Sequence, residues 1–386
     1  MVDGPCESFG IYVHIPFCTS RCDYCAFHSS VDWSIDAQRT IVRRVIVDLH
    51  AIDLPRAPTT VYVGGGTPTS LDPPLLDELL ATLAARFSPV EFTLEANPES
   101  ATDERLSIAA HHGVDRLSVG VQSLDAGTLR RIGRRGTDAD RIEAIRRRWP
   151  STLSADLITG VPGVRPGTSR ADVDRLAAIG IDHISVYGLS IEPETPLATR
   201  TRSGGDAQAA DGWAGLVGSI ESHGYRRYEV SNFSRGSPCL HNVGYWRQCD
   251  YIGVGPSAVS TIRDVPPDGS IAAVRIEQPA DHSRWLSRPQ WTDAPSERLS
   301  MRDLILEHLM LGLRRTDGLS FARFAARYGH DLRELVGDEI DLLSDESLVV
   351  GDRETMRATP RGLDLLDPVL VRLFDAVCRN LDTVAT

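Results

Sequence analysis

Three cysteines lie within eight residues of one another near the start of the chain, at the spacing C-x3-C-x2-C. They are Cys18, Cys22 and Cys25. Three thiolates on one short loop can hold three irons of a [4Fe–4S] cluster and leave the fourth iron open to an external ligand. A zinc site completed by His14 or His28 is the alternative, although structural zinc sites favour paired CxxC motifs. The spacing therefore favours an iron–sulfur cluster.

The cysteine loop follows the first of six expected β-strands, which alternate with helical segments. Short β-branched runs predict strands at 10–15, 60–64, 91–96, 116–121, 153–158 and 183–189. Amphipathic segments that end near Gly or Pro predict helices at 36–51, 74–87, 102–112, 139–149 and 168–178. Six successive βα units require a parallel sheet with right-handed crossovers. We therefore expect an α/β fold, a partial TIM-like (β/α)6 barrel whose functional groups lie at the C-terminal strand ends.

Polar residues stand near the C-terminal ends of three of these strands. They are Glu95, Gln122 and Asp156. A single residue of this kind carries little information, but three at equivalent strand ends face one common mouth of the barrel. The glycine run 64–66, followed by Thr67, comes after the second strand, where glycines let the backbone approach a ligand closely. A simple tight turn is the alternative for these glycines.

The rest of the chain changes character twice. Residues 224–290 are rich in aromatic residues, Gly, Pro and Ser, and we expect extended segments and loops that complete one side of the barrel. Helical patterns return from Ser300, and a strand-like hairpin follows three helices, which resembles a winged helix. We therefore expect three parts, with boundaries at 1–223, 224–296 and 297–386.

The composition is that of a folded chain, with 41 % hydrophobic and 24 % charged residues. The net charge of −12, and 12 Arg against 17 Asp and Glu in residues 297–386, argue against a nucleic-acid partner and favour a structural or protein-docking role for the C-terminal part. No run approaches the roughly 18 uncharged apolar residues of a membrane helix, and the first residues lack a signal-peptide pattern. We expect a cytoplasmic protein, with peripheral membrane contact and oligomeric state left open.

The ordered motifs resemble the radical S-adenosylmethionine (radical SAM) superfamily. More narrowly, they are similar to the branch that contains HemN-like oxygen-independent coproporphyrinogen oxidases and HemW-type haem chaperones. The resemblance covers nearly the whole chain and rests on segments 12–25, 64–68, 95–98, 120–123, 156–158, 228–232 and 241–246. In that superfamily SAM chelates the open iron, and a one-electron reduction cleaves a carbon–sulfur bond to give a 5′-deoxyadenosyl radical.

The resemblance implies a [4Fe–4S] cluster and SAM as cofactors, and an electron donor as a partner. The positions that match the family's SAM contacts are Tyr12, Tyr24, Gly65, Gly66, Thr67, Glu95, Gln122, Arg134 and Asp156. Carboxylates and amides at the strand ends can hydrogen-bond the ammonium and ribose hydroxyls of SAM. Arg134 lies within the basic run RRIGRR, for which a solvated helix face is the alternative.

Two features favour the chaperones over the oxidases. The oxidases resemble C-x3-C-x2-C-x-C, with a further cysteine at the position of Phe27, and they carry a long segment before the first strand, which here begins near residue 10. The resemblance therefore implies a HemW-type chaperone that binds haem, the cluster and SAM and delivers haem to target proteins. A coproporphyrinogen III oxidase and a HemN-like radical SAM methyltransferase or cyclopropanase stay open as alternatives, and so does the question of whether the chain is an enzyme.

The HNxxYW segment at 241–246 also resembles the chaperones, in which its histidine is implicated in haem binding. His241 can supply an axial imidazole to iron, and Tyr245 and Trp246 offer flat apolar surfaces to a porphyrin. Cys239 is a second candidate ligand. The alternative is a loop histidine that hydrogen-bonds the backbone beside aromatics that pack on the barrel.

Two positions depart from the family pattern. Ala26 replaces the Asp that is common after the third cysteine, and Val259 stands where the family usually has His. If that histidine assists haem binding, its absence lowers the affinity for haem or changes the ligand.

Overall fold

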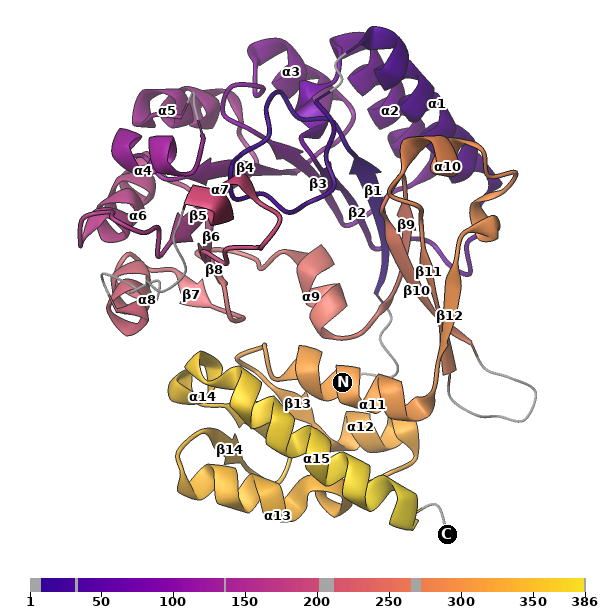
Figure 1. The fold of residues 1–386 in the computed structure, drawn as a ribbon, viewed down its shortest axis with the longest axis vertical. Coiled ribbons are helices and arrows are strands. Elements are labelled where there is room, and N and C mark those ends of the chain that lie inside the picture. Colours follow the sequence, from indigo (N-terminus) through magenta and orange to yellow (C-terminus); the bar gives the residue numbers. More distant parts are fainter. Residues whose placement is uncertain (1–7, 32–33, 135–136, 201–211, 265–271, 385–386) are drawn as a thin grey trace.

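The computed structural model describes residues 8–31, 34–134, 137–200, 212–264 and 272–384. Figure 1 shows two parts along the long axis of the molecule: an α/β part built on one large sheet, and a smaller, mostly helical part formed by the C-terminal residues. The cysteine loop lies at the end of the α/β part that faces away from the smaller part.

Six parallel strands form the centre of the large sheet. They are β1 (Phe9–Ile15), β2 (Thr60–Gly65), β3 (Glu91–Ala96), β4 (Arg116–Gln122), β5 (Thr152–Thr159) and β6 (His183–Gly188). Every residue of β1 except Tyr12 is buried, as expected of parallel strands that are covered on both faces. The predicted order of six βα units is confirmed.

The sheet continues beyond β1 on one side and beyond β6 on the other. The added strands are β7 (Arg226–Arg227), β8 (Asn232–Ser234), β9 (Asp250–Val254), β10 (Val259–Asp264), β11 (Ala272–Glu277) and β12 (Ser296–Leu299). The order is β12-β11-β10-β9-β1-β2-β3-β4-β5-β6-β8-β7, with β9 parallel to β1 and the outer strands antiparallel. The described strands thus form an open, mixed sheet, and the expected partial barrel is confirmed.

Helices cover the outer face of the curved sheet (Figure 1). They are α1 (Ile35–Ala51), α2 (Pro73–Arg86), α3 (Asp103–His111), α4 (Ala126–Arg131), α5 (Ala139–Arg148), α6 (Thr168–Ile179) and α8 (Trp213–Ser222). The short helix α7 (Pro196–Arg200) instead contacts the cysteine loop, where the Leu197 N–H donates to Asp23 O at 2.8 Å. Several helices begin at a side chain that accepts a backbone N–H of the first turn, such as Ser34 for α1 and Asp138 for α5. The helices α4, α7 and α8 were not among those expected from the sequence.

The expectation of only extended segments and loops over residues 224–290 was wrong at two places. Helix α9 (Leu240–Trp246) contains the HNxxYW segment, and α10 (His282–Leu286) follows β11. The carboxylate of Glu91, at the start of β3, accepts the backbone N–H groups of Leu240 at 2.9 Å and His241 at 3.0 Å. A residue distant in sequence therefore accepts the free backbone N–H groups at the start of α9. A local sequence pattern cannot show such a contact.

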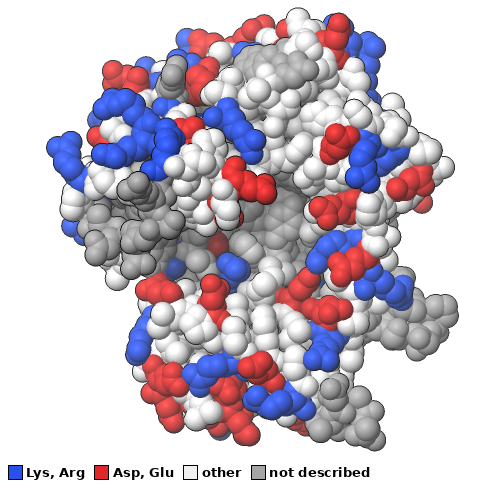
Figure 2. All heavy atoms as spheres, in the orientation of Figure 1, with Lys and Arg blue, Asp and Glu red and all other residues white. Residues whose placement is uncertain are grey.

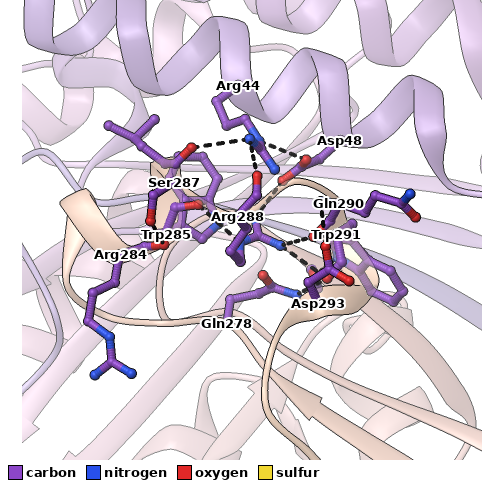
Figure 3. A network of polar contacts seen from close by, with 12 residues as sticks. Arg44, Asp48, Gln278, Arg284, Trp285, Ser287, Arg288, Gln290, Trp291 and Asp293 are labelled. Carbon is purple, nitrogen blue, oxygen red and sulfur yellow. Dashed lines mark hydrogen bonds and ion pairs between the residues drawn. The ribbon is translucent and has the colours of Figure 1, made fainter.

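A buried network of polar contacts ties the segment around α10 to α1 (Figure 3). The Arg288 guanidinium, 6 % exposed, donates to Asp48 Oδ2 at 2.8 Å and to the carbonyl oxygens of Trp285 and Trp291 at 3.0 Å. Arg44 donates to Asp48 Oδ1 at 2.9 Å and to the Arg288 carbonyl at 2.8 Å. The network fixes one edge of the α/β part beside the cysteine loop.

The C-terminal part has its own hydrophobic core and a small sheet. Its elements are α11 (Met301–Gly312), β13 (Leu319–Ser320), α12 (Phe321–Tyr328), α13 (Leu332–Asp345), β14 (Val349–Gly351), β15 (Thr355–Ala358), α14 (Pro360–Asp364) and α15 (Leu366–Val384). The antiparallel order β13-β15-β14 forms the expected wing beside the helices.

The surface of the C-terminal part carries mixed charge. Figure 2 shows acidic and basic side chains interspersed over the face that it presents. This arrangement agrees with the acidic balance of residues 297–386. Within the described part of the chain, no helix is long and apolar enough to cross a membrane.

Candidate functional site

The three cysteines lie on the loop between β1 and α1. Cys18, Cys22 and Cys25 are reduced and partly buried. Backbone hydrogen bonds shape the loop: Cys18 N–H donates to Ser30 O at 3.0 Å, and Cys25 N–H donates to Cys22 O at 3.2 Å. Burial raises the pKa of the Cys18 and Cys25 thiols, and charge on the neighbouring cysteines raises it further. Binding of a cationic centre offsets this cost, because the metal ligand is the thiolate.

Polar donors from other loops approach the cysteine sulfurs. Thr67 Oγ1 lies 3.7 Å from Cys18 Sγ, and Arg134 Nη1 donates to Cys22 Sγ at 3.5 Å. The Arg134 side chain is 7 % exposed, and its Nε atom is buried with no hydrogen-bond partner among the described residues. Three thiols on one loop, supported by donors and beside an orphaned buried N–H, fit a [4Fe–4S] cluster with an anionic ligand.

The histidines of the zinc alternative are engaged with one another. His14 Nδ1 lies 3.1 Å from the Tyr12 hydroxyl, and His14 Nε2 lies 3.2 Å from the His28 carbonyl oxygen. His28 Nε2 lies 3.3 Å from His282 Nε2 of α10. The contacts of His14 and His28 therefore do not support the zinc alternative.

The glycine run after β2 packs directly against the cysteine loop. Gly65 has φ +109°, and a Cβ there would lie 2.7 Å from the His14 ring. A Cβ on Gly66 would lie 2.6 Å from the Phe17 carbonyl oxygen. Only glycine allows this close approach, so the run is more than a simple tight turn. The glycine run leads into Thr67, whose side chain faces the cysteine loop.

Glu95 lies at the end of β3 with both carboxylate oxygens bonded. The Tyr62 hydroxyl donates to Oε1 at 2.6 Å, and the Gly65 N–H donates to Oε2 at 3.1 Å. Burial raises the pKa of Glu95 to about 7, and the hydrogen bond from Tyr62 opposes this rise. The carboxylate is thus poised between its charged and neutral forms near neutral pH.

Arg134 and Asn97 connect two loops beside the cysteines. Arg134 Nη2 donates to Asn97 Oδ1 at 2.6 Å and to Gly120 O at 2.5 Å, and Asn97 Nδ2 donates to Thr67 Oγ1 at 2.8 Å. Burial opposes the charge of Arg134, but Cys22 and Tyr24 raise its pKa above the usual arginine value. Arg134 is therefore a buried cation, and the solvated-face alternative was wrong for it.

Asn97 was not predicted as a site residue, although it stands in the quoted segment at 95–98. Its signal was available in the sequence, because it follows β3 by one residue and so shares the strand end with Glu95. Its two amide atoms join Thr67 to Arg134, which no spacing rule could show.

Gln122 and Asp156 lie on the neighbouring strands β4 and β5. Gln122 follows a register shift in β4 and has φ +66°, an uncommon conformation for a residue other than glycine. Asp156 Oδ2 accepts from Ser118 Oγ at 3.3 Å. Burial raises the pKa of Asp156, and its hydrogen bond with Ser185 opposes the rise. Gln122 thus ends β4 as expected, whereas β5 continues for three residues beyond Asp156.

Of the two predicted tyrosines, Tyr12 lies in β1 and Tyr24 lies on the cysteine loop itself. Tyr12, in β1, packs on the Tyr62 ring with centroids 6.1 Å apart. Tyr24 packs against the small cluster of buried residues that contains Ile132 and Ile158. Burial raises the pKa of Tyr24, and the Cys22 thiol contributes to the rise. The hydroxyls of Tyr12 and Tyr24 are therefore neutral hydrogen-bond donors on or next to the cysteine loop.

His241 lies at the opposite end of the barrel, where α9 covers the first residues of β1 and β2 (Figure 1). Its Nδ1 atom lies 2.7 Å from Thr60 Oγ1, and its Nε2 atom lies 2.9 Å from the Tyr245 hydroxyl. Burial lowers the pKa of His241 to about 3, so the imidazole is neutral. Both nitrogens have side-chain partners, so His241 is neither the free ligand nor the backbone-bonded loop histidine that the sequence left open.

Cys239, the second candidate haem ligand, is fully buried beside Glu91, and its Sγ atom donates to Glu91 Oε1 at 3.5 Å. Burial raises the pKa of Cys239 to about 12. The thiol is therefore neutral in this conformation and is a poor ligand for iron.

Comparisons with known proteins agree with this geometry. Residues 12–168 match the sequence model of the radical SAM superfamily, and residues 299–365 match that of the HemN C-terminal domain. The chain is 30 % identical over 369 residues to the heme chaperone HemW of Lactococcus lactis, which covers 92 % of this chain and 94 % of that protein. The chain belongs to the HemW-like branch of the radical SAM superfamily. It is also 32 % identical over 392 residues to the heme chaperone HemW of Mycobacterium tuberculosis, which covers 96 % of both proteins.

The solved structure of coproporphyrinogen III oxidase (HemN) from Escherichia coli has the same fold. It matches with a TM-score of 0.79 at 20 % sequence identity and covers 96 % of this chain and 90 % of that one. At this identity the likeness shows the architecture, namely the radical SAM sheet together with the C-terminal helical part.

Membership in the radical SAM superfamily implies a [4Fe–4S] cluster and SAM. When bound together, they supply a one-electron reductive cleavage of SAM. Backbone hydrogen bonds hold the cysteine loop against the residues that follow β2. Arg134 places a buried positive charge beside Cys22, and Glu95 places a carboxylate near the end of β3. Cys18, Cys22 and Cys25 are the residues that would hold the cluster.

Proposed function

We propose that this protein is a HemW-type haem chaperone that binds a [4Fe–4S] cluster, SAM and haem and delivers the haem to target proteins. The observation that carries the proposal is similarity over almost the full length to several heme chaperones. A partial match to the radical SAM core would not separate a chaperone from the many enzymes that share it.

The position of Phe27 supports the chaperone over the oxidase. The oxidase pattern has a fourth cysteine at this position. In this chain Phe27 takes its place and is 73 % exposed on the surface of the cysteine loop. The loop therefore offers three thiols where the oxidase pattern has four. An electron donor would reach the cluster from this surface, and the need to keep the cluster from oxygen favours a cytoplasmic setting.

Haem binding at α9 requires a local change. Iron needs the lone pair of an imidazole nitrogen, and both nitrogens of His241 have partners in this conformation. Nε2 is the nitrogen that can be released at lower cost, because its partner, Tyr245, lies on α9 itself, whereas Thr60 belongs to β2. We therefore propose Nε2 as the iron ligand, with the Tyr245 ring turned aside.

Haem titration of the anaerobically reconstituted protein tests this function, together with an assay for coproporphyrinogen decarboxylation. We expect about one haem per chain and no decarboxylation. Steady formation of protoporphyrinogen IX would favour the oxidase instead. Absence of both haem binding and decarboxylation would favour the methyltransferase alternative.

A further inference from the structure

Tyr62 contacts both a proposed SAM contact and the proposed haem ligand. Tyr62, in β2, donates its hydroxyl to Glu95 Oε1 at 2.6 Å. Its ring packs against the imidazole of His241, with centroids 5.1 Å apart and planes inclined by 31°. Tyr62 is absent from the set of positions that match the family's SAM contacts, yet it holds one of them directly.

We infer that Tyr62 is a positioning residue for SAM, which fixes the Glu95 carboxylate in the orientation that receives the ligand. This inference rests on the proposed function, because it takes Glu95 as a SAM contact. Tyr62 acts through Glu95 and is not itself placed against the ligand.

The carboxylate has little freedom once Tyr62 is in place. Tyr62 and the Gly65 N–H hold its two oxygens, and both donors come from β2. A Cβ on Gly64 would lie 2.8 Å from Glu95 Cδ and 2.9 Å from Tyr62 Cε1, so the backbone of β2 presses on both side chains. Such packing selects one rotamer of Glu95 and leaves the remaining lone pairs for a ligand.

Neighbouring rings hold Tyr62 in turn. Its ring lies between Tyr12, at 6.1 Å, and His241, at 5.1 Å between centroids. His241 is itself held by Thr60 and Tyr245. Loss of the Tyr62 hydroxyl alone therefore leaves the ring in place and removes only the hydrogen bond to Glu95.

The groups around Glu95 predict how the affinity for SAM depends on pH. The titratable groups that face it are Tyr12 from β1, Tyr62 from β2, Arg116 from β4, Asp156 from β5, Tyr187 from β6 and Tyr245 from α9. Burial raises the pKa of Glu95 to about 7, Asp156 adds to the rise, and Tyr62, the Gly65 N–H and Arg116 oppose it. SAM affinity should fall as the pH drops through this value, because a protonated carboxyl loses an acceptor.

The test compares SAM dissociation constants of the cluster-loaded wild type, Tyr62→Phe and Tyr225→Phe, measured anaerobically by equilibrium dialysis between about pH 6 and about pH 8.5. Tyr225 is a matched control, because its buried hydroxyl donates to Ile181 O at 2.7 Å, away from the site. Tyr62→Phe should weaken SAM binding roughly three- to tenfold, the size of a typical net hydrogen bond, because the lost bond acts on SAM only through Glu95. It should also move the midpoint of the pH profile upward, because Tyr62 stabilises the charged form of Glu95.

The pH shift separates positioning from a merely structural role. Both variants bind the same ligand, so the ligand's own titration cancels in the comparison. In a Glu95→Gln background, Tyr62→Phe should produce no further pH shift. SAM binding by Tyr62→Phe with wild-type affinity and midpoint would overturn this inference alone. A cluster-loaded wild type that binds no SAM would overturn the proposed function as well.

Discussion

The Nη1 atom of Arg134 donates to the Sγ atom of Cys22 across 3.5 Å, although 112 residues separate the two in the chain. A buried cation therefore lies beside one of the proposed cluster ligands. Positive charge near an iron–sulfur cluster stabilises the reduced form, which carries one more negative charge.

Replacing Arg134 by Gln should lower the reduction potential of the cluster. A unit charge about 6 Å away at an effective dielectric constant of about 20 gives a change on the order of 100 mV. A redox titration followed by electron paramagnetic resonance measures it. Arg131→Gln is the control, because Arg131 is exposed at the end of α4 in the same basic run. An unchanged or higher potential in Arg134→Gln would contradict the placement of this charge beside the cluster.

The second prediction concerns cluster assembly. Anaerobic reconstitution should yield about four irons per chain, and replacement of Cys18, Cys22 and Cys25 together by Ala should abolish the broad cluster absorbance. Cys378→Ala is the control, because Cys378 lies on α15 in the C-terminal part. One equivalent of zinc without labile sulfide would overturn the iron–sulfur assignment.

Glu95→Ala and Asp156→Ala should each weaken SAM binding to the reduced, cluster-loaded protein. Each substitution removes a charged hydrogen-bond partner, which costs about 1–3 kcal/mol. The effect of SAM on the electron paramagnetic resonance spectrum reports binding, and circular dichroism checks the fold. The SAM pocket would lie elsewhere if neither variant changed the affinity.

The sequence predicted the six βα units because each strand is a short run rich in β-branched and other apolar residues, which can be recognised without a distant partner. Residue type, together with a position at or near a strand end or on the first loop, also singles out the cysteines, Glu95 and Asp156, and their part in holding the cofactors stays a prediction. The sequence did not predict α9, whose first turn is satisfied by Glu91 of β3. The role of Tyr62 was equally hidden, because a hydrogen bond to Glu95 and a ring contact with His241 arise only when β2, β3 and α9 meet.

The network that holds the α10 segment predicts a large stability effect at residues that are not proposed to contact a cofactor. Asp48 is 2 % exposed and is paired with Arg288 and Arg44, so Asp48→Asn leaves a buried charge uncompensated. The free energy of unfolding should fall by about 3–5 kcal/mol, measured by urea denaturation of the reconstituted protein. Asp36→Asn breaks an exposed ion pair with Arg39 and should change little. Similar midpoints for the two variants would contradict the importance of the network.

The last prediction concerns haem. His241→Ala should weaken haem binding or shift the Soret band, because the loss of an axial imidazole changes the ligand field of the iron. Tyr245→Phe should do the opposite and tighten binding modestly, since it removes the hydroxyl that occupies His241 Nε2 while it keeps a ring for the porphyrin. Haem titration of the reconstituted protein, followed by absorbance, measures both variants.

Two further variants complete this experiment. Cys239→Ala should leave haem binding unchanged, because its buried thiol is neutral and bonded to Glu91. Val259→His restores the residue that the family usually has, and tighter binding would show that this position of β10 assists haem. A Soret band that is the same in His241→Ala and the wild type would exclude His241 as the ligand. A band lost only in Cys239→Ala would instead assign the iron to the thiolate, which would require the Glu91 contact with Cys239 to open.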